Sequence, residues 1–211
     1  MRGVIFDLDG TLLDSLGDIA AAMNRTLAAR GFPTHPLGAY RSFIGEGVQK
    51  LAERALPLEH HAERSSVVAA YQTDYAQHLL ASSVPYPGIP ALLDALTERQ
   101  VPMTVLSNKP DAPTRRLLEA LFGRWPFRAV AGERPGMPRK PDPAVALKLA
   151  EVMGVPAADV SFVGDTLVDV TCARAAGMRP VGVLWGFRPA EVAAAGVPTV
   201  QHPGELLPLL T

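Results

Sequence analysis

The sequence predicts an α/β fold, in which helices cover both faces of a parallel sheet and a separate helical segment follows the first strand. Four short, mainly apolar stretches predict the strands, at residues 3–6, 103–106, 160–163 and 180–184. Helical patterns lie between these stretches. A third observation predicts the insertion, because residues 14–86 contain several helical patterns and no convincing strand.

The alternation of strands and helices predicts how the layers are arranged. Continuous apolar runs are typical of parallel strands that are buried on both faces. Large aliphatic residues recur at helical spacing in residues 89–96, 117–121 and 145–152. Strand, helix, strand in succession implies right-handed crossovers that place helices on both sides of the sheet. We therefore predict a three-layer, Rossmann-like parallel sheet core.

The helical insertion predicts a second domain. Residues 82–88 contain two prolines and a glycine, which favour extended and turn conformations over helix. This segment would end the insertion and serve as a hinge. We therefore expect a core domain of residues 1–13 and 87–211 and a helical cap domain of residues 14–86.

The composition is that of a soluble globular protein, with 48% hydrophobic and 19% charged residues among 211. Twenty basic and 21 acidic residues give a net charge of −1, so we expect neither nucleic acid nor a membrane surface as a partner. The acidic Asp7 interrupts the apolar start, which argues against a signal peptide. No apolar run approaches the roughly 20 residues that a membrane span needs. We expect a cytoplasmic monomer or homodimer.

The single cysteine and the five histidines do not predict a site. Cys172 has no disulfide partner and is expected to be a small buried residue. The histidines show no paired metal-ligand spacing, which favours surface or packing roles.

Two strand ends carry pairs of carboxylates. Asp7 and Asp9 directly follow residues 3–6, with Gly10 and Thr11 after them. Asp165 follows residues 160–163 and is four residues before Asp169, so the two would share a face if both lie on a helix. The carboxyl ends of parallel strands usually form the site of an open α/β sheet. Taken alone, each string also fits an acidic surface turn or a helix cap.

Two further stretches supply hydroxyl, amide and ammonium groups. Ser107, Asn108 and Lys109 follow residues 103–106, and Lys140 precedes Pro141. The chain has only four lysines, so lysine at these two places is informative. Each stretch alone also fits an ordinary polar loop.

The four stretches together predict phosphoryl transfer. That chemistry depends on positioning and on neutralising charge. A carboxylate that attacks a phosphate dianion meets repulsion, so we expect Mg²⁺ held by oxygen ligands and a lysine on the remaining phosphate oxygens.

In order and residue type, these motifs resemble those of the haloacid dehalogenase superfamily of phosphohydrolases. The resemblance spans nearly the whole chain and implies that Asp7 is the nucleophile and Asp9 the general acid and base. It also implies that Ser107 and Lys140 bind the phosphoryl group, and that the metal is held by the carboxylates of Asp7, Asp165 and Asp169 and the carbonyl of Asp9. Thr11 and Asn108 are expected to assist substrate binding. The aspartate at position 9 favours a phosphatase or phosphotransferase over dehalogenation.

A loop in the predicted cap resembles the specificity loop of phosphoglycolate phosphatases. Gly45 and Gly47 precede a helical pattern and would expose N–H groups to an anion, while Arg41 or Lys50 would assist a carboxylate. Glu46 departs from what an anionic substrate would prefer. A plain turn between helices also fits this loop.

We therefore predict a magnesium-dependent phosphatase that forms an aspartyl-phosphate and acts on a small phosphorylated metabolite, with phosphoglycolate or a similar phosphoacid favoured. A phosphomutase or pyrophosphatase of the same superfamily remains the nearest alternative. A phospho-accepting signalling module is a further one, against which Asp9 and the cap argue.

Overall fold

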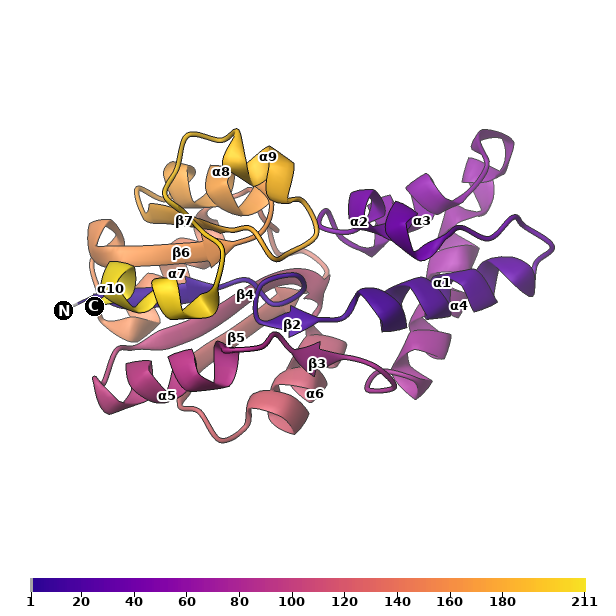
Figure 1. Ribbon diagram of the computed structural model, residues 1–211. Helices are drawn as coiled ribbons and strands as arrows, with labels where there is room; N and C mark the ends of the chain where they lie inside the picture. The colour runs from indigo at the N-terminus through magenta and orange to yellow at the C-terminus, as the bar shows by residue number, and fades with distance from the viewer. Residues whose placement is uncertain (1) are drawn as a thin grey trace.

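A parallel sheet of six strands lies at the centre of the core. The computed structural model describes residues 2–211, and the strand order is β5-β4-β1-β6-β7-β8, with every neighbouring pair parallel. The strands are β1 (Gly3–Phe6), β4 (Met103–Pro110), β5 (Phe127–Glu133), β6 (Val160–Gly164), β7 (Arg179–Val183) and β8 (Thr199–Val200). The expected α/β fold is confirmed. Since β4 and β6 flank β1, the ends of these three strands adjoin one another (Figure 1).

Helices cover the sheet on both faces and make the three layers. Strand β1 alternates between them, because Val4 and Phe6 belong to one apolar cluster and Ile5 to the other. The first cluster includes residues of α5 (Ile89–Glu98), α6 (Asp111–Phe122) and α10 (Leu207–Leu210), and the second includes residues of α7 (Ala144–Met153) and α8 (Leu167–Ala175). The short helix α9 (Pro189–Ala193) follows β7. Cys172 is fully buried in the second cluster, as expected.

Two strands of the six-stranded sheet were not predicted, and both are at its edges. Strand β5 is only half-buried over most of its length, so it lacks the apolar run that marks a central strand. Strand β8 has two residues. The four expected strands are all present. Each lies between two neighbouring strands and is largely buried, which explains why its sequence is a recognisable apolar run.

Four helices form a lobe beside the sheet, on the right of Figure 1. They are α1 (Leu16–Ala28), α2 (Tyr40–Phe43), α3 (Val48–Ala55) and α4 (Arg64–Gln77). In α1, buried side chains recur at helical spacing at Ile19, Met23 and Leu27, which gives the lobe an apolar interior. Helix α10 and the start of β1 lie at the opposite end of the molecule (Figure 1).

A two-stranded antiparallel ribbon joins the two parts. It pairs β2 (Leu13–Asp14) with β3 (Val84–Pro85), so the chain enters and leaves the helical lobe at adjacent points. We propose that this ribbon is the boundary between a core domain, residues 1–13 and 87–211, and a cap domain, residues 14–86. Met1 lies outside the described residues.

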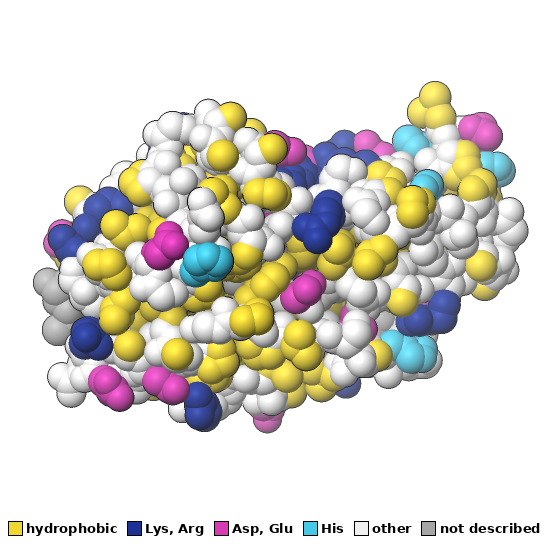
Figure 2. All heavy atoms as spheres, in the orientation of Figure 1, with side chains coloured by type: hydrophobic (Ala, Val, Ile, Leu, Met, Phe, Trp, Pro, Cys, Tyr) yellow, Lys and Arg dark blue, Asp and Glu magenta, His cyan; other side chains and the backbone are white. Residues whose placement is uncertain are grey.

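The surface carries charges of both signs. On the face drawn in Figure 2, Lys and Arg side chains are interspersed with Asp and Glu. Within residues 2–211, no helix combines the length and apolar character that crossing a membrane requires.

Candidate active site

Asp7 and Asp9 lie where β1 ends. The Asp7 backbone N–H donates to the carbonyl of Val163 in β6, which fixes Asp7 beside the neighbouring strand. After it the chain turns sharply, because Leu8 accepts hydrogen bonds from the N–H groups of the residues at 11, 12 and 13. Gly10 has φ of +84°, a conformation that other residues rarely adopt. The turn keeps both carboxylates at the end of the strand.

Asp165 and Asp169 lie where β6 ends, but not on a common helix. Asp165 precedes α8, and Thr166 caps that helix. The Thr166 backbone N–H and hydroxyl donate to one oxygen of Asp169, at 3.1 and 2.7 Å. The expected shared helix face is therefore wrong, since a capping box in the first turn directs Asp169 back toward the strand end.

Three buried carboxylates meet around one lysine. Asp7, Asp165 and Asp169 each offer an oxygen within 4.8 Å of the others. Lys140 lies 2.8 Å from Asp7 and 2.6 Å from Asp169, and its side chain is only 2% exposed. Three acidic groups against one ammonium leave excess negative potential in a site that water hardly reaches.

This imbalance shifts the proton affinities of the acids. Burial, opposed by Lys140 and reinforced by Asp169, raises the pKa of Asp7 from 3.8 to about 7. Burial and the charge of Asp7 hold the pKa of Asp165 well above its usual range. For Lys140, burial acts to lower the pKa, but Asp169 and Asp7 together raise it above the usual lysine value. Lys140 thus stays charged.

The acidic cluster fits a divalent cation. Hard cations such as Mg²⁺ prefer oxygen ligands, and a second positive charge would balance the excess of carboxylates. The carboxylate of Asp9 is not in this group of three. Its predicted contribution is the backbone carbonyl, which stays a prediction.

Two glycines leave the room that the Asp165 side chain occupies. A Cβ at Gly10 would lie 2.2 Å from the Oδ2 of Asp165, and one at Gly186 would lie 2.3 Å from its Cβ. That Oδ2 also accepts a 2.7 Å hydrogen bond from the N–H of Phe187. From the sequence, residues 185–187 were expected at most to line the mouth of the site, and the contacts of Gly186 and Phe187 with Asp165 were not predicted. Their position directly after the strand at residues 180–184 was the available signal.

The end of β4 supplies the remaining polar groups. Ser107 and Asn108 are buried, and the Asn108 amide donates to the carbonyls of Lys140, at 2.9 Å, and of Gly45, at 3.2 Å. Lys109 donates to both carboxylate oxygens of Asp9, at 2.8 and 2.9 Å. The sequence singled out Lys109 together with Ser107 and Asn108 but gave it no role of its own; in the structure it is the partner of Asp9.

These groups open onto one cavity of about 310 Å³ between the sheet and the helical lobe. From the core it is lined by Asp7, Asp9, Ser107, Asn108 and Lys140. From the lobe it is lined by Gly45 and Gly47, where Gly47 immediately precedes α3, and by mostly apolar side chains. The predicted core residues and the predicted glycine loop therefore face the same space.

Three predicted substrate-binding residues do not line this cavity. Arg41 donates to the carbonyl of Gly186 at 3.1 Å. Lys50 pairs with Glu53 at 2.6 Å on α3. Thr11 is fully buried, with its hydroxyl 3.4 Å from Asp165. The contacts made by each side chain turn it away from the space where substrate would bind.

Glu46 also points away from the cavity. Its carboxylate contacts Arg54 and lies 3.8 Å from Arg188. The hydrogen bond from Arg54 outweighs burial and lowers the pKa of Glu46. The negative charge that seemed at odds with an anionic substrate is thus neutralised outside the cavity.

Comparison with known proteins agrees with this geometry. A family model described as Haloacid dehalogenase-like hydrolase matches residues 4–183. A phosphoglycolate phosphatase of Rhodospirillum rubrum is 37% identical over 203 residues, covering 92% of this chain and 84% of that protein. Phosphoglycolate phosphatase 1 of Pseudomonas aeruginosa is 35% identical over 216 residues, covering 98% of this chain and 79% of that protein.

Solved structures share the whole architecture. One from Lactobacillus delbrueckii subsp. bulgaricus superimposes with a TM-score of 0.93 at 27% identity, covering 100% of this chain and 99% of that chain. The match therefore includes the helical lobe as well as the sheet.

Proposed function

The chain belongs to the haloacid dehalogenase-like hydrolase family and is a phosphatase, and we propose that it cleaves the phosphomonoester of a small phosphorylated carboxylic acid through a phosphorylated Asp7. One observation carries the proposal. Asp7 lies at the end of the central strand, in contact with Lys140, and faces a cavity that Asp9 also lines.

The positions of Asp7 and Asp9 support two half-reactions. In the first, a carboxylate oxygen of Asp7 forms a bond to phosphorus as the bond to the leaving oxygen breaks, and Asp9 gives that oxygen a proton. In the second, Asp9 takes a proton from water, the water oxygen bonds to phosphorus, and Asp7 is released with inorganic phosphate. One carboxyl group can serve both steps because the proton that it gives to the leaving oxygen is replaced by the one that it takes from water.

The residues around Asp7 support its orientation and the binding of the phosphoryl group. Lys140 contacts Asp7 and Asp169, which leaves its ammonium beside the reacting oxygen. Ser107 has a hydroxyl that can donate to a phosphoryl oxygen in the same cavity. We propose Mg²⁺ as the cation, held by Asp7, Asp165 and Asp169, with the Asp9 carbonyl as a further ligand. When bound, it would offset the repulsion between carboxylate and phosphate.

The names of the relatives support the substrate class. Two relatives at 37% and 35% identity are named phosphoglycolate phosphatases. Phosphoglycolate joins a phosphoryl group to a two-carbon acid, so it is the first substrate to test.

The experiment is phosphate release by purified protein with Mg²⁺ from a panel of phosphoacids, sugar phosphates, nucleotides and pyrophosphate. We expect release from a small phosphoacid and at least a roughly thousandfold loss in Asp7→Asn, because the amide is a poor nucleophile. Circular dichroism of the variant controls for folding.

Other results would contradict the proposal. No release from any ester would overturn it, and undiminished release by Asp7→Asn would exclude the aspartyl-phosphate. Conversion between phosphate isomers without release would indicate a mutase. A phosphoprotein stable for minutes without turnover would indicate a signalling module.

A further inference from the structure

We infer that Arg116 binds the carboxylate of the substrate and so makes the protein selective for phosphorylated acids over neutral phosphomonoesters. The inference rests on the proposed function and identifies the residue that recognises the part of the substrate remote from phosphorus. Arg116 lies on α6, in the core, and was not among the residues that the sequence singled out.

Arg116 differs from the other cations that face the cavity. Three basic side chains line it: Lys109, Lys140 and Arg116. Lys109 is paired with Asp9, and Lys140 with Asp7 and Asp169. Arg116 makes no ion pair with any carboxylate in residues 2–211. It is therefore the one cavity-lining cation whose charge is not already neutralised by the protein.

The part of the cavity wall that the helical lobe forms is uncharged. The helical lobe presents apolar side chains to the cavity, including Ile19, Val48 and Leu51. The two cations expected to assist a carboxylate, Arg41 and Lys50, are engaged elsewhere. A second negative charge on the substrate would therefore find no unpaired cation in the described cavity wall except Arg116, and burying an unpaired charge is costly.

Arg116 is held at the junction of core and lobe. One Nη1 hydrogen donates at 3.1 Å to the carbonyl of Ala76, in the last turn of α4, where helix carbonyls have no partner within the helix. A guanidinium has five N–H donors, so the others stay available for a planar carboxylate. Arg116 is exposed while lining the cavity, which puts it at the mouth.

A purely structural role would look different from a role in recognition. If Arg116 only capped α4, its loss would lower stability and affect all substrates alike. If it binds a carboxylate, its loss would act selectively on substrates that carry one. The chain offers a matched control, because the adjacent Arg115 pairs with Asp111 at 2.8 Å and does not line the cavity.

The experiment compares kcat/KM for 2-phosphoglycolate and for ethyl phosphate, which has two carbons and no carboxylate. We expect Arg116→Gln to lower the ratio of the two values by roughly ten- to a hundredfold, as for loss of a charged hydrogen bond, mainly through KM. Arg116→Lys keeps the charge without the planar guanidinium, so its ratio should lie between those of the wild type and Arg116→Gln. Arg115→Gln should keep the wild-type ratio.

Each outcome decides the inference. A ratio within about twofold of wild type in Arg116→Gln would overturn it, whatever the total activity. If Arg116→Gln does not fold, Arg116→Lys provides the same comparison. If the wild type hydrolyses neither ester, the proposed function fails. Carboxylate recognition by Arg116 is then tested independently by ligand binding. Calorimetry would compare 3-phosphonopropionate with propylphosphonate, and an equal affinity ratio in wild type and Arg116→Gln would refute carboxylate recognition.

Discussion

The ammonium of Lys109 lies 2.8 and 2.9 Å from the two carboxylate oxygens of Asp9, whereas Lys140 contacts Asp7. Each acid of the Asp7 and Asp9 pair thus has its own lysine, which relieves the repulsion expected between two carboxylates at one strand end. Lys109 also lies 4.8 Å from the centre of the Tyr75 ring, in the helical lobe. The lobe therefore covers the contact between Lys109 and Asp9, whose side chains are only 5% and 11% exposed.

Replacing Lys109 tests whether this contact positions Asp9. Because Asp9 is assigned the proton transfer to the leaving oxygen, we expect Lys109→Met to lower kcat for an alkyl phosphate by roughly ten- to a hundredfold. The loss should be smaller for p-nitrophenyl phosphate, whose leaving group needs no proton. Steady-state kinetics on both esters measures this.

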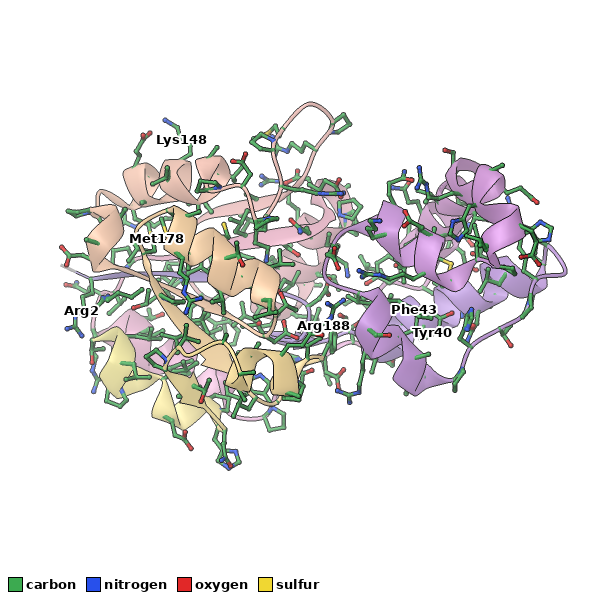
Figure 3. The ribbon with its side chains drawn as sticks, turned by 90° about the horizontal axis from the view of Figure 1, so that it is seen from above. Arg2, Tyr40, Phe43, Lys148, Met178 and Arg188 are labelled. Carbon is green, nitrogen blue, oxygen red and sulfur yellow. The ribbon has the colours of Figure 1, made fainter. Side chains whose placement is uncertain are left out.

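Lys148 provides the control for that variant. It is an exposed lysine that pairs with Glu151 on α7, remote from the cavity (Figure 3). Lys148→Met should retain wild-type kinetics on both esters. Equal losses on the two esters in Lys109→Met would refute a role through proton transfer.

The acidic cluster predicts opposite effects of pH on stability and on metal binding. Asp7 has a pKa of about 7 in the folded protein against 3.8 ordinarily. A folded group that holds its proton more tightly than the unfolded chain stabilises the fold at low pH, and that contribution is lost as pH rises through about 7. Mg²⁺ needs the deprotonated carboxylates, so its binding strengthens over the same range.

We therefore expect metal-free stability to fall between about pH 4 and about pH 7, and Mg²⁺ to raise Tm more at about pH 8 than at about pH 5.5. Thermal unfolding with and without Mg²⁺ checks both expectations. Asp165→Asn should remove most of the Mg²⁺ effect. A shift of equal size at both pH values would contradict the assignment.

Adding one methyl group at Gly186 should lower both the stability of the fold and the affinity for Mg²⁺. A Cβ there would lie 2.3 Å from the Asp165 Cβ and 2.4 Å from the Gly10 carbonyl oxygen. The Gly10 carbonyl belongs to the backbone and cannot rotate away as a side chain could. The added methyl group would therefore displace Asp165. We expect Gly186→Ala to lower the free energy of unfolding by about 1–3 kcal/mol and to weaken Mg²⁺ binding.

The control for Gly186→Ala is Gly204→Ala, whose Cβ would meet nothing within 4 Å. It should leave both quantities near wild type. Calorimetric titration with Mg²⁺ measures the affinity, and undiminished affinity in Gly186→Ala would show that Asp165 is not held by this close approach.

Arg188 helps to hold the helical lobe against the core. It lies at the junction of the sheet-bearing part and the helical lobe (Figure 3) and donates to the carbonyls of Ser42, at 2.8 Å, and Ile44, at 2.6 Å. Its neighbour Gly186 accepts from Arg41 in the reverse direction. These bonds hold the loop that contains Gly45 against the core.

We expect Arg188→Gln to speed amide hydrogen exchange in residues 42–48 by roughly tenfold or more, because charged hydrogen bonds to the loop are lost. Arg179→Gln is the control, since Arg179 bonds to the carbonyl of Asp159 within the core. Unchanged exchange in residues 42–48 would mean that other contacts close the lobe.

The sequence by itself determined the sheet and the acidic centre. Central strands are buried on both faces, so residues 3–6 and 160–163 read as apolar runs, and parallel strands end at one edge. Any acid that directly follows such a run must lie there. This reasoning places Asp7 and Asp165 together from the sequence alone, and the geometry agrees. Lys140 follows no predicted strand, so its place in the site came from the family resemblance and is supported by its contact with Asp7.

Only the tertiary structure decided which cations serve which anions. Arg41, Lys50 and Arg116 cannot be told apart in the sequence as partners of an anion, since a long flexible side chain can point in many directions. Packing of the lobe against the core directs Arg41 to a carbonyl and leaves Arg116 unpaired at the cavity. Local sequence specifies backbone at strand ends, whereas the partner of a long charged side chain depends on contacts between residues far apart in the chain.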